Sequence, residues 1–133
     1  MNKIICLPSK VAYLSSITLY LVVMGIVSGC VPQTYSQLKA ETKPFQWIGK
    51  KNAIDISECV STAWESLLYP HIFVKPIKNG YRIDNITLNG FILFSADITE
   101  LDGASKINLW ITKQFSMPES VTEAAKKAVV ACL

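Results

Sequence analysis

Three turn dipeptides, Asn79-Gly80, Asn89-Gly90 and Asp102-Gly103, divide the second half of the chain into short segments rich in β-branched and aromatic residues. Asn-Gly and Asp-Gly tolerate positive φ at the central positions of a type I′ turn, whose twist matches that of a β-hairpin. The spacing therefore predicts a four-stranded antiparallel meander, with strands over residues 71–77, 81–87, 91–99 and 106–115.

The residue pattern inside these segments indicates where the strands lie in the sheet. The uninterrupted apolar run 91–94 is typical of a central strand covered on both faces. Pro76 has no backbone N–H to donate, which favours an edge strand or a bulge at that position. In the last segment Ile107, Leu109 and Ile111 alternate with other residues, so we expect these three side chains to face the core.

Trp110 alternates with the core-facing residues of the last strand and is therefore expected on the opposite face of the sheet. Tryptophan is enriched in interface hot spots, and Trp110 is accordingly a candidate for partner binding. Two alternatives stay open: the second face is itself covered, or Trp110 pairs with an aromatic residue on a neighbouring strand.

A helix is predicted on each side of the meander. Apolar residues recur at helical spacing over residues 56–68 and again from Val121 to Cys132. Segments with the spacing of a capping box precede both, namely Asp55-Ile56-Ser57-Glu58 and Ser116-Met117-Pro118-Glu119. The predicted fold class is α+β: an N-terminal helix, a four-stranded antiparallel meander and a C-terminal helix.

The amino terminus has the pattern of an export signal. Lys3 and Lys10 supply a positive n-region, and residues 11–29 follow without a single charge. The apolar part ends at the small residues Ser28 and Gly29, which allow an extended backbone to enter a peptidase site. An uncleaved membrane-spanning helix is an alternative interpretation, since nineteen uncharged residues can cross a bilayer.

Val27-Ser28-Gly29-Cys30 resembles the lipobox of bacterial lipoproteins, in which an aliphatic residue and two small residues precede a cysteine. The resemblance implies thioether attachment of diacylglycerol to Cys30, cleavage after Gly29 and acylation of the new amino group. Several acyl chains of the palmitate type would hold the protein firmly on a membrane. By analogy with the family's sorting pattern, Val31 in place of Asp implies the outer membrane, with the domain facing the periplasm.

The chain contains four cysteines, and the lipoprotein interpretation accounts for two of them. Cys6 is removed with the leader and Cys30 carries the lipid, which leaves Cys59 and Cys132. Two remaining thiols in an oxidising compartment are expected to form a disulfide, with two buried free thiols as the alternative. Both lie on the apolar faces of their helices, and Trp64 is expected to pack in the core beside them.

The predicted organisation is a signal peptide over residues 1–29, a lipid-anchored tether over residues 30–52 and one small domain over residues 53–133. The tether is polar and lacks sustained periodicity. Phe45, Trp47 and Ile48 are its apolar exceptions; we expect them to dock on the domain, with contact at the lipid interface as the alternative.

The residues carry little sign of catalytic chemistry. His71 is the one histidine, and a surface or capping role is favoured over that of a base. Asp97, Glu100 and Asp102 lack the spacing of a calcium loop and are expected to form a solvated hairpin end. After the leader, eleven Lys and Arg face ten Asp and Glu, which argues against nucleic-acid binding.

These observations predict a non-enzymatic binding or interaction module on the bacterial envelope, with no cofactor or metal. From 56 to 133 the chain also loosely resembles small envelope lipoproteins that bring no known activity. Two alternatives are a small periplasm-facing hydrolase or transferase that uses His71, and an exclusion or immunity lipoprotein of a mobile element.

Overall fold

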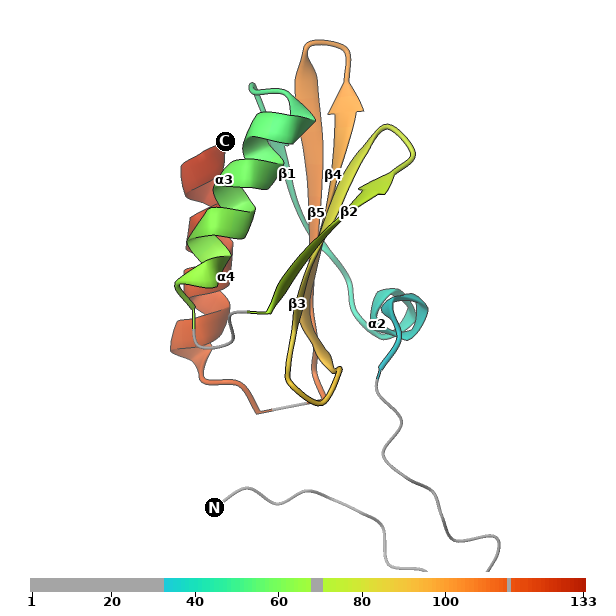
Figure 1. The fold of residues 1–133 in the computed structure, drawn as a ribbon, viewed down its shortest axis with the longest axis vertical. Coiled ribbons are helices and arrows are strands. Elements are labelled where there is room, and N and C mark those ends of the chain that lie inside the picture. Colours follow the sequence, from blue (N-terminus) through green and yellow to red (C-terminus); the bar gives the residue numbers. More distant parts are fainter. Residues whose placement is uncertain (1–32, 68–70, 115) are drawn as a thin grey trace, which may run out of the picture. The chain divides into compact units, whose positions relative to one another are not determined.

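The computed structural model describes residues 33–67, 71–114 and 116–133. They belong to a compact unit that spans Pro32–Leu133. Its elements are α2 (Tyr35–Glu41), β1 (Phe45–Gly49), α3 (Ala53–Glu65), β2 (Ile72–Ile77), β3 (Gly80–Ile86), β4 (Ile92–Leu101), β5 (Ala104–Ile111) and α4 (Glu119–Cys132) (Figure 1). The predicted signal peptide, the lipobox and Cys30 lie outside the described residues.

The sheet is antiparallel and has the strand order β1-β5-β4-β3-β2. The meander from β2 to β5 is the predicted one, and positive φ at Asn79, Gly90 and Gly103 accompanies its three turns. β2, which contains Pro76, is an edge strand, and β4 is central with residues 92–98 buried. The α+β class is therefore confirmed.

The number of strands is corrected from four to five. The additional strand, β1, pairs with β5, with Phe45 opposite Leu109 and Trp47 opposite Ile107. The stretch expected to be a tether is thus part of the folded domain from Gln33 onward, and Trp47 docks as expected. Five residues are too few to show a clear period of two, so the strand is specified by its pairing with β5 and not by its own pattern.

The helix starts also differ from the prediction. α3 begins at Ala53, because Asn52 and not Asp55 is the N-cap; its side chain accepts a hydrogen bond from the Asp55 amide at 2.8 Å. The Ala53 amide donates to the Glu100 carboxylate at 2.8 Å, so a strand residue helps to satisfy the helix start. α4 follows Pro118 and has no side-chain cap, which corrects the proposed capping box there.

The main core lies between the sheet and the helices α3 and α4, which pack together on one face (Figure 1). Its largest fully buried side chains include Trp64, Phe94, Ile98, Ile107 and Leu109. A second, smaller cluster lies on the other face, where Leu38 of α2 packs with Ile92 and Trp110. The sheet is therefore covered on both faces at β4.

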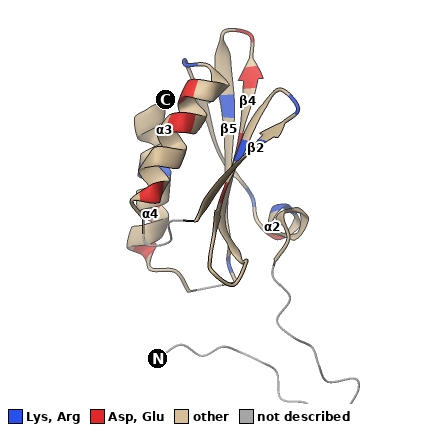
Figure 2. Cartoon of the chain, viewed as in Figure 1, with Lys and Arg blue, Asp and Glu red and all other residues tan. Residues whose placement is uncertain are grey.

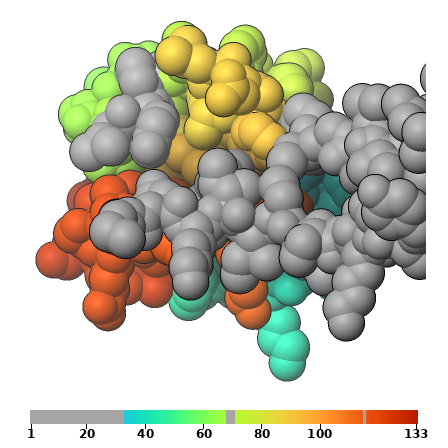
Figure 3. Space-filling model, turned by 90° about the horizontal axis from the view of Figure 1, so that it is seen from below, coloured from blue at the N-terminus to red at the C-terminus, as the bar shows by residue number. Residues whose placement is uncertain are grey.

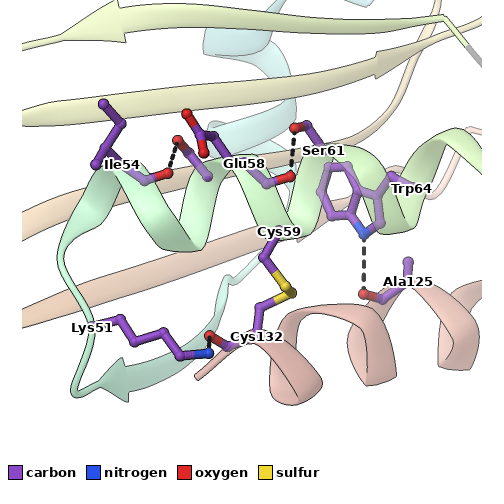
Figure 4. The surroundings of a disulfide bond; sticks show 9 residues. Lys51, Ile54, Glu58, Cys59, Ser61, Trp64, Ala125 and Cys132 are labelled. Atoms are coloured by element: carbon purple, nitrogen blue, oxygen red, sulfur yellow. Dashed lines mark hydrogen bonds between the residues drawn. A yellow bond between two sulfur atoms is a disulfide. The ribbon is translucent and has the colours of Figure 1, made fainter.

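The predicted disulfide is present and joins Cys59 of α3 to Cys132 of α4 (Figure 4). Trp64 is fully buried near it and donates its indole N–H to the Ala125 carbonyl at 3.2 Å, which links the same two helices. Lys51 Nζ donates to the Cys132 carbonyl at 2.9 Å and so helps to satisfy the end of α4. The expected core position of Trp64 is confirmed.

Candidate functional site

A cluster of charged and aromatic side chains lies on the sheet face that α2 covers. Tyr35 and Lys39 come from α2, four residues apart and hence on one side of the helix. Arg82 of β3 and Asp97 of β4 are direct partners across the strand pair. Trp110 of β5 completes the set, which we call the α2 cluster.

Asp97 is the centre of the α2 cluster. Arg82 Nε donates to its Oδ1 at 2.8 Å, the Tyr35 hydroxyl donates to its Oδ2, and Lys39 Nζ lies 3.7 Å from Oδ2. The Arg82 guanidinium lies 3.3 Å from the Tyr35 ring centroid. Charge, hydrogen bonding and ring stacking thus join one helix to two strands.

Lys39 also contacts the two aromatic rings of the α2 cluster. Lys39 Nζ lies 4.6 Å from the Trp110 ring centroid and 5.0 Å from that of Tyr35. The Tyr35 and Trp110 rings meet edge to face at 5.8 Å. Lys39 therefore makes cation–π contacts with both rings in addition to its ion pair with Asp97.

A second buried carboxylate, Asp84, lies two residues along β3 from Arg82 and hence on the same face of the sheet. Ser95 Oγ donates to its Oδ1 at 2.6 Å, and Lys75 Nζ lies 3.4 Å from its Oδ2. Asp84 is 2% exposed, so these partners offset most of the cost of removing its charge from water.

The surroundings of Tyr35 raise its pKa well above the ordinary value for a phenol. Burial is the largest cause, and the hydrogen bond to Asp97 and its negative charge act in the same direction. Burial by itself would lower the pKa of Arg82, but the hydrogen bond and charge of Asp97 raise it overall. Tyr35 is therefore a neutral donor at physiological pH and Arg82 a permanent cation.

The contacts of the α2 cluster hold α2 against the sheet. Each oxygen of Asp97 and of Asp84 already has a donor or a cation from the same domain. A general base must instead direct a carboxylate oxygen at a substrate proton. The cluster thus positions α2 and balances the buried charges of the sheet.

Trp110 is 5% exposed, which contradicts its proposed role as an exposed partner-binding residue. The alternative of a second covered face is the correct one, because α2 lies over the indole. Asp97 is also buried, at 7% exposed, and does not belong to a solvated hairpin end. Glu100 and Asp102 are exposed near the turn as expected.

His71 lies just before β2 and is exposed. Its backbone carbonyl accepts a hydrogen bond from the Ile86 amide at 2.9 Å. Its side chain makes no hydrogen bond or ion pair with another described residue. Within the same part of the chain, no three His, Cys, Asp or Glu side chains come together as a metal site would require.

An open groove of ≈ 1050 Å³ runs between the end of α2, the end of β5 and the start of α4. Three lysines lie along it, Lys39, Lys43 and Lys113, and the carboxylate of Glu41 accepts a hydrogen bond from the Gln33 side chain at 2.6 Å. Its other lining residues are Ala40, Thr42, Pro44, Phe45, Ile111, Thr112, Ser116, Met117 and Thr122. We call this surface the lysine groove.

The α2 cluster and the lysine groove were both missed in the sequence because α2 was not recognised. One signal was available: Thr34 and Gln37 have the spacing of a capping box. In the structure Gln37 N donates to Thr34 Oγ1 at 3.3 Å, and Thr34 N donates to Gln37 Oε1 at 2.8 Å. The helix is only seven residues long, too short for a clear apolar period.

Among the helices that the structure describes, none combines the length and the apolar character needed to span a membrane. Comparisons of the chain with protein-family models, with curated proteins and with solved structures find no significant match.

Proposed function

We propose that this chain is a bacterial lipoprotein, attached to the envelope through lipid on Cys30, and that its domain is a non-enzymatic binding or interaction module. By the sorting analogy above, the outer membrane is its location and the domain faces the periplasm. No cofactor or metal is part of the proposal.

The observation that carries the proposal is the allocation of the cysteines. Cys59 and Cys132 are joined in the folded domain, which leaves Cys30 as the one further cysteine after the expected cleavage site. Disulfides persist in oxidising compartments such as the periplasm, and this is where a cleaved lipobox would deliver the domain. The pairing therefore supports export independently of the lipobox residues.

A binding role is supported by the chemistry of the two surfaces described above. Asp97 serves the attachment of α2 and Asp84 is paired within the sheet. The lysine groove, by contrast, is open and presents Lys43 and Lys113 beside Pro44, Phe45 and Met117. This combination fits an envelope protein segment with acidic and apolar side chains.

Metabolic labelling with an alkyne fatty acid tests the anchor. Wild type and Cys6→Ala are expected to take up the label, because Cys6 is lost with the leader, and Cys30→Ala is expected to lose it. Equal labelling of the Cys30→Ala protein, or an intact leader with an unmodified Cys30 in the mass spectrum of the wild-type protein, would contradict attachment at this residue.

Photo-crosslinking in intact cells tests the binding role. A photoreactive residue at Thr122, which lines the lysine groove, is expected to yield an adduct with an acidic protein; Lys127, exposed on the same helix, serves as the control position. Lys43→Glu is expected to abolish the adduct, whereas Lys78→Glu, in the turn between β2 and β3, leaves it. An adduct that survives Lys43→Glu would argue against an acidic partner.

A further inference from the structure

With lipid on Cys30, the folded domain would lie much closer to the lipid than the predicted 23-residue tether over residues 30–52 would allow. Gln33 is already fixed: it is 3% exposed, its Oε1 accepts a hydrogen bond from Thr112 Oγ1 at 2.8 Å, and its Nε2 donates to Glu41 at 2.6 Å. Cys30 is three residues earlier, and three residues span at most about 11 Å. If Cys30 carries the lipid, as proposed above, the end of the domain that holds Gln33 lies close to the membrane.

That end of the domain is the one with the β3–β4 turn. Thr112, the partner of Gln33, donates its amide to the Leu93 carbonyl at 2.9 Å, so Gln33 lies at the level where β4 begins. The turn continues past this level and is closed by hydrogen bonds between Thr87 and Phe91. Figure 3 shows the domain from this end, with atoms of the β3–β4 region in yellow.

The turn has the side chains expected of a surface that touches lipid. Leu88 at its tip is 86% exposed, the highest value among the large hydrophobic residues that the structure describes as exposed. Residues 85–96, which include the whole turn, contain no Asp, Glu, Lys or Arg. A tip without charge can enter the headgroup region without removing an ion from water.

The turns at the opposite end of the sheet have charged side chains. Lys78 precedes Gly80 in the β2–β3 turn, and Glu100 and Asp102 flank the β4–β5 turn. Figure 2 shows these charged positions at the end of the sheet away from the β3–β4 turn, which is drawn without charge colours. The uncharged turn is thus the one at the end of the sheet that holds Gln33.

We propose that the β3–β4 turn, residues 87–91, rests on the leaflet that holds the anchor and that Leu88 enters its headgroup region. This inference depends on lipidation at Cys30. It means that the membrane orients the domain, with the β2–β3 and β4–β5 turns directed away from the bilayer.

Depth-dependent quenching on the full lipidated protein tests the proposal. Leu88→Cys and the matched Leu101→Cys each introduce a single reactive thiol, because the proposed thioether to diacylglycerol occupies the Cys30 sulfur and Cys59 is bonded to Cys132. The proteins are labelled with an environment-sensitive nitrobenzoxadiazole dye. They are placed in vesicles of phosphatidylethanolamine and phosphatidylglycerol that contain nitroxide-headgroup lipid.

We expect quenching at residue 88 to exceed that at residue 101 about threefold or more, since the ten residues of β4 separate the two positions by about 30 Å. Equal quenching at both positions, or none at residue 88, would overturn the proposal. A blue shift at residue 88 that occurs in native envelopes but not in the lipid vesicles would also overturn it, because a protein partner would then cover the turn.

Two controls separate this inference from the proposed function. Mass spectrometry of the labelled proteins establishes whether Cys30 carries lipid: unmodified Cys30 means that the proposed anchor fails, whereas lipid on Cys30 with equal quenching means that only the membrane contact of the turn fails. Thermal unfolding of both labelled variants is expected to match that of wild type, since Leu88 and Leu101 are exposed.

Discussion

At the scale of single residues, Tyr35 shows how one side chain attaches a helix that has little stability of its own. Its hydroxyl donates to Asp97, its ring stacks on the guanidinium of Arg82, and its edge meets Trp110. Asp97 in turn needs these donors, because a buried carboxylate without partners is costly. The helix and the buried charge of the sheet therefore stabilise each other.

Tyr35→Phe is expected to lower the free energy of unfolding by about 1–2 kcal/mol at neutral pH, because a hydrogen bond to a charged group is lost. Urea denaturation measures this change. Tyr81→Phe is the control, since the Tyr81 hydroxyl makes no hydrogen bond with another described residue. Equal losses in the two variants would mean that the Asp97 contact contributes nothing specific.

The pH dependence of stability gives a second test of Tyr35. Folding raises the pKa of Tyr35, so in an alkaline window that begins near 10.0, the ordinary pKa of a tyrosine phenol, the unfolded chain loses the proton first and the folded chain keeps it. The free energy of unfolding therefore falls as pH rises above this value. Denaturation between about pH 8 and about pH 11 should show a steeper fall in wild type than in Tyr35→Phe; parallel curves would contradict the assignment.

Gly80 is constrained by a close backbone approach between β3 and β4. A Cβ atom there would lie 1.9 Å from the Ile98 carbonyl oxygen, so the strands would have to separate. Gly80→Ala is expected to cost about 3 kcal/mol, measured by chemical denaturation. At Gly103 an added Cβ would meet no atom within 4 Å. Gly103→Ala should therefore lower the free energy of unfolding by only about 1 kcal/mol, which reflects the positive φ of 72° at this residue.

At the scale of elements, the domain depends on two attachments between distant segments. On one face the disulfide and the Trp64 hydrogen bond join α3 to α4. On the other face the α2 cluster joins α2 to β3 and β4, and β1 adds its backbone hydrogen bonds to β5. The sheet between them contributes seven of the fourteen buried residues of the main core.

Removal of the disulfide in Cys59→Ala/Cys132→Ala is expected to cost about 4 kcal/mol in the chain-entropy model, because the two cysteines are 73 residues apart. The free energy of unfolding of a small domain is only about 5–15 kcal/mol, so the variant should be marginally stable. Guanidinium denaturation with and without reductant measures the effect. Wild type should lose stability in reductant while the variant does not change; a reductant-insensitive wild type would contradict the role of the bond.

At the scale of the whole molecule, residues 33–49 are integral to the domain. They supply the helix that covers Trp110 and the strand that pairs with β5. They also bring the folded domain to within three residues of Cys30. With lipid on Cys30, as proposed, the tether between the lipid and the folded domain would be short and not long.

A chain that begins at residue 53 is therefore expected not to fold cooperatively. It would expose Trp110, Ile92 and the β5 edge, a loss of about 5 kcal/mol of apolar burial that is comparable to the stability of a small domain. A chain that begins at residue 33 should give a single sharp urea transition. Equal cooperativity in the two chains would show that α2 and β1 are dispensable.

The sequence by itself determined the elements whose patterns are local and long enough to recognise. The turn dipeptides placed four strands to within a few residues, and the helical spacing placed Cys59 and Cys132 on packed helices. The disulfide was expected from the predicted oxidising compartment and is present. Pro76 and the apolar run 91–94 gave the correct edge and centre of the sheet. These features depend on backbone preference and on the alternation of apolar residues, which neighbouring residues already express.

Only the tertiary structure decided the role of the segment before Ala53 and the environment of Trp110 and Asp97. α2 and β1 are seven and five residues long, so neither has a stable period, and each forms because distant strands supply partners. The burial of Asp97 likewise depends on Tyr35, which lies 62 residues earlier in the chain. Such contacts arise from the packing of separate segments and leave no local pattern in the residues that make them.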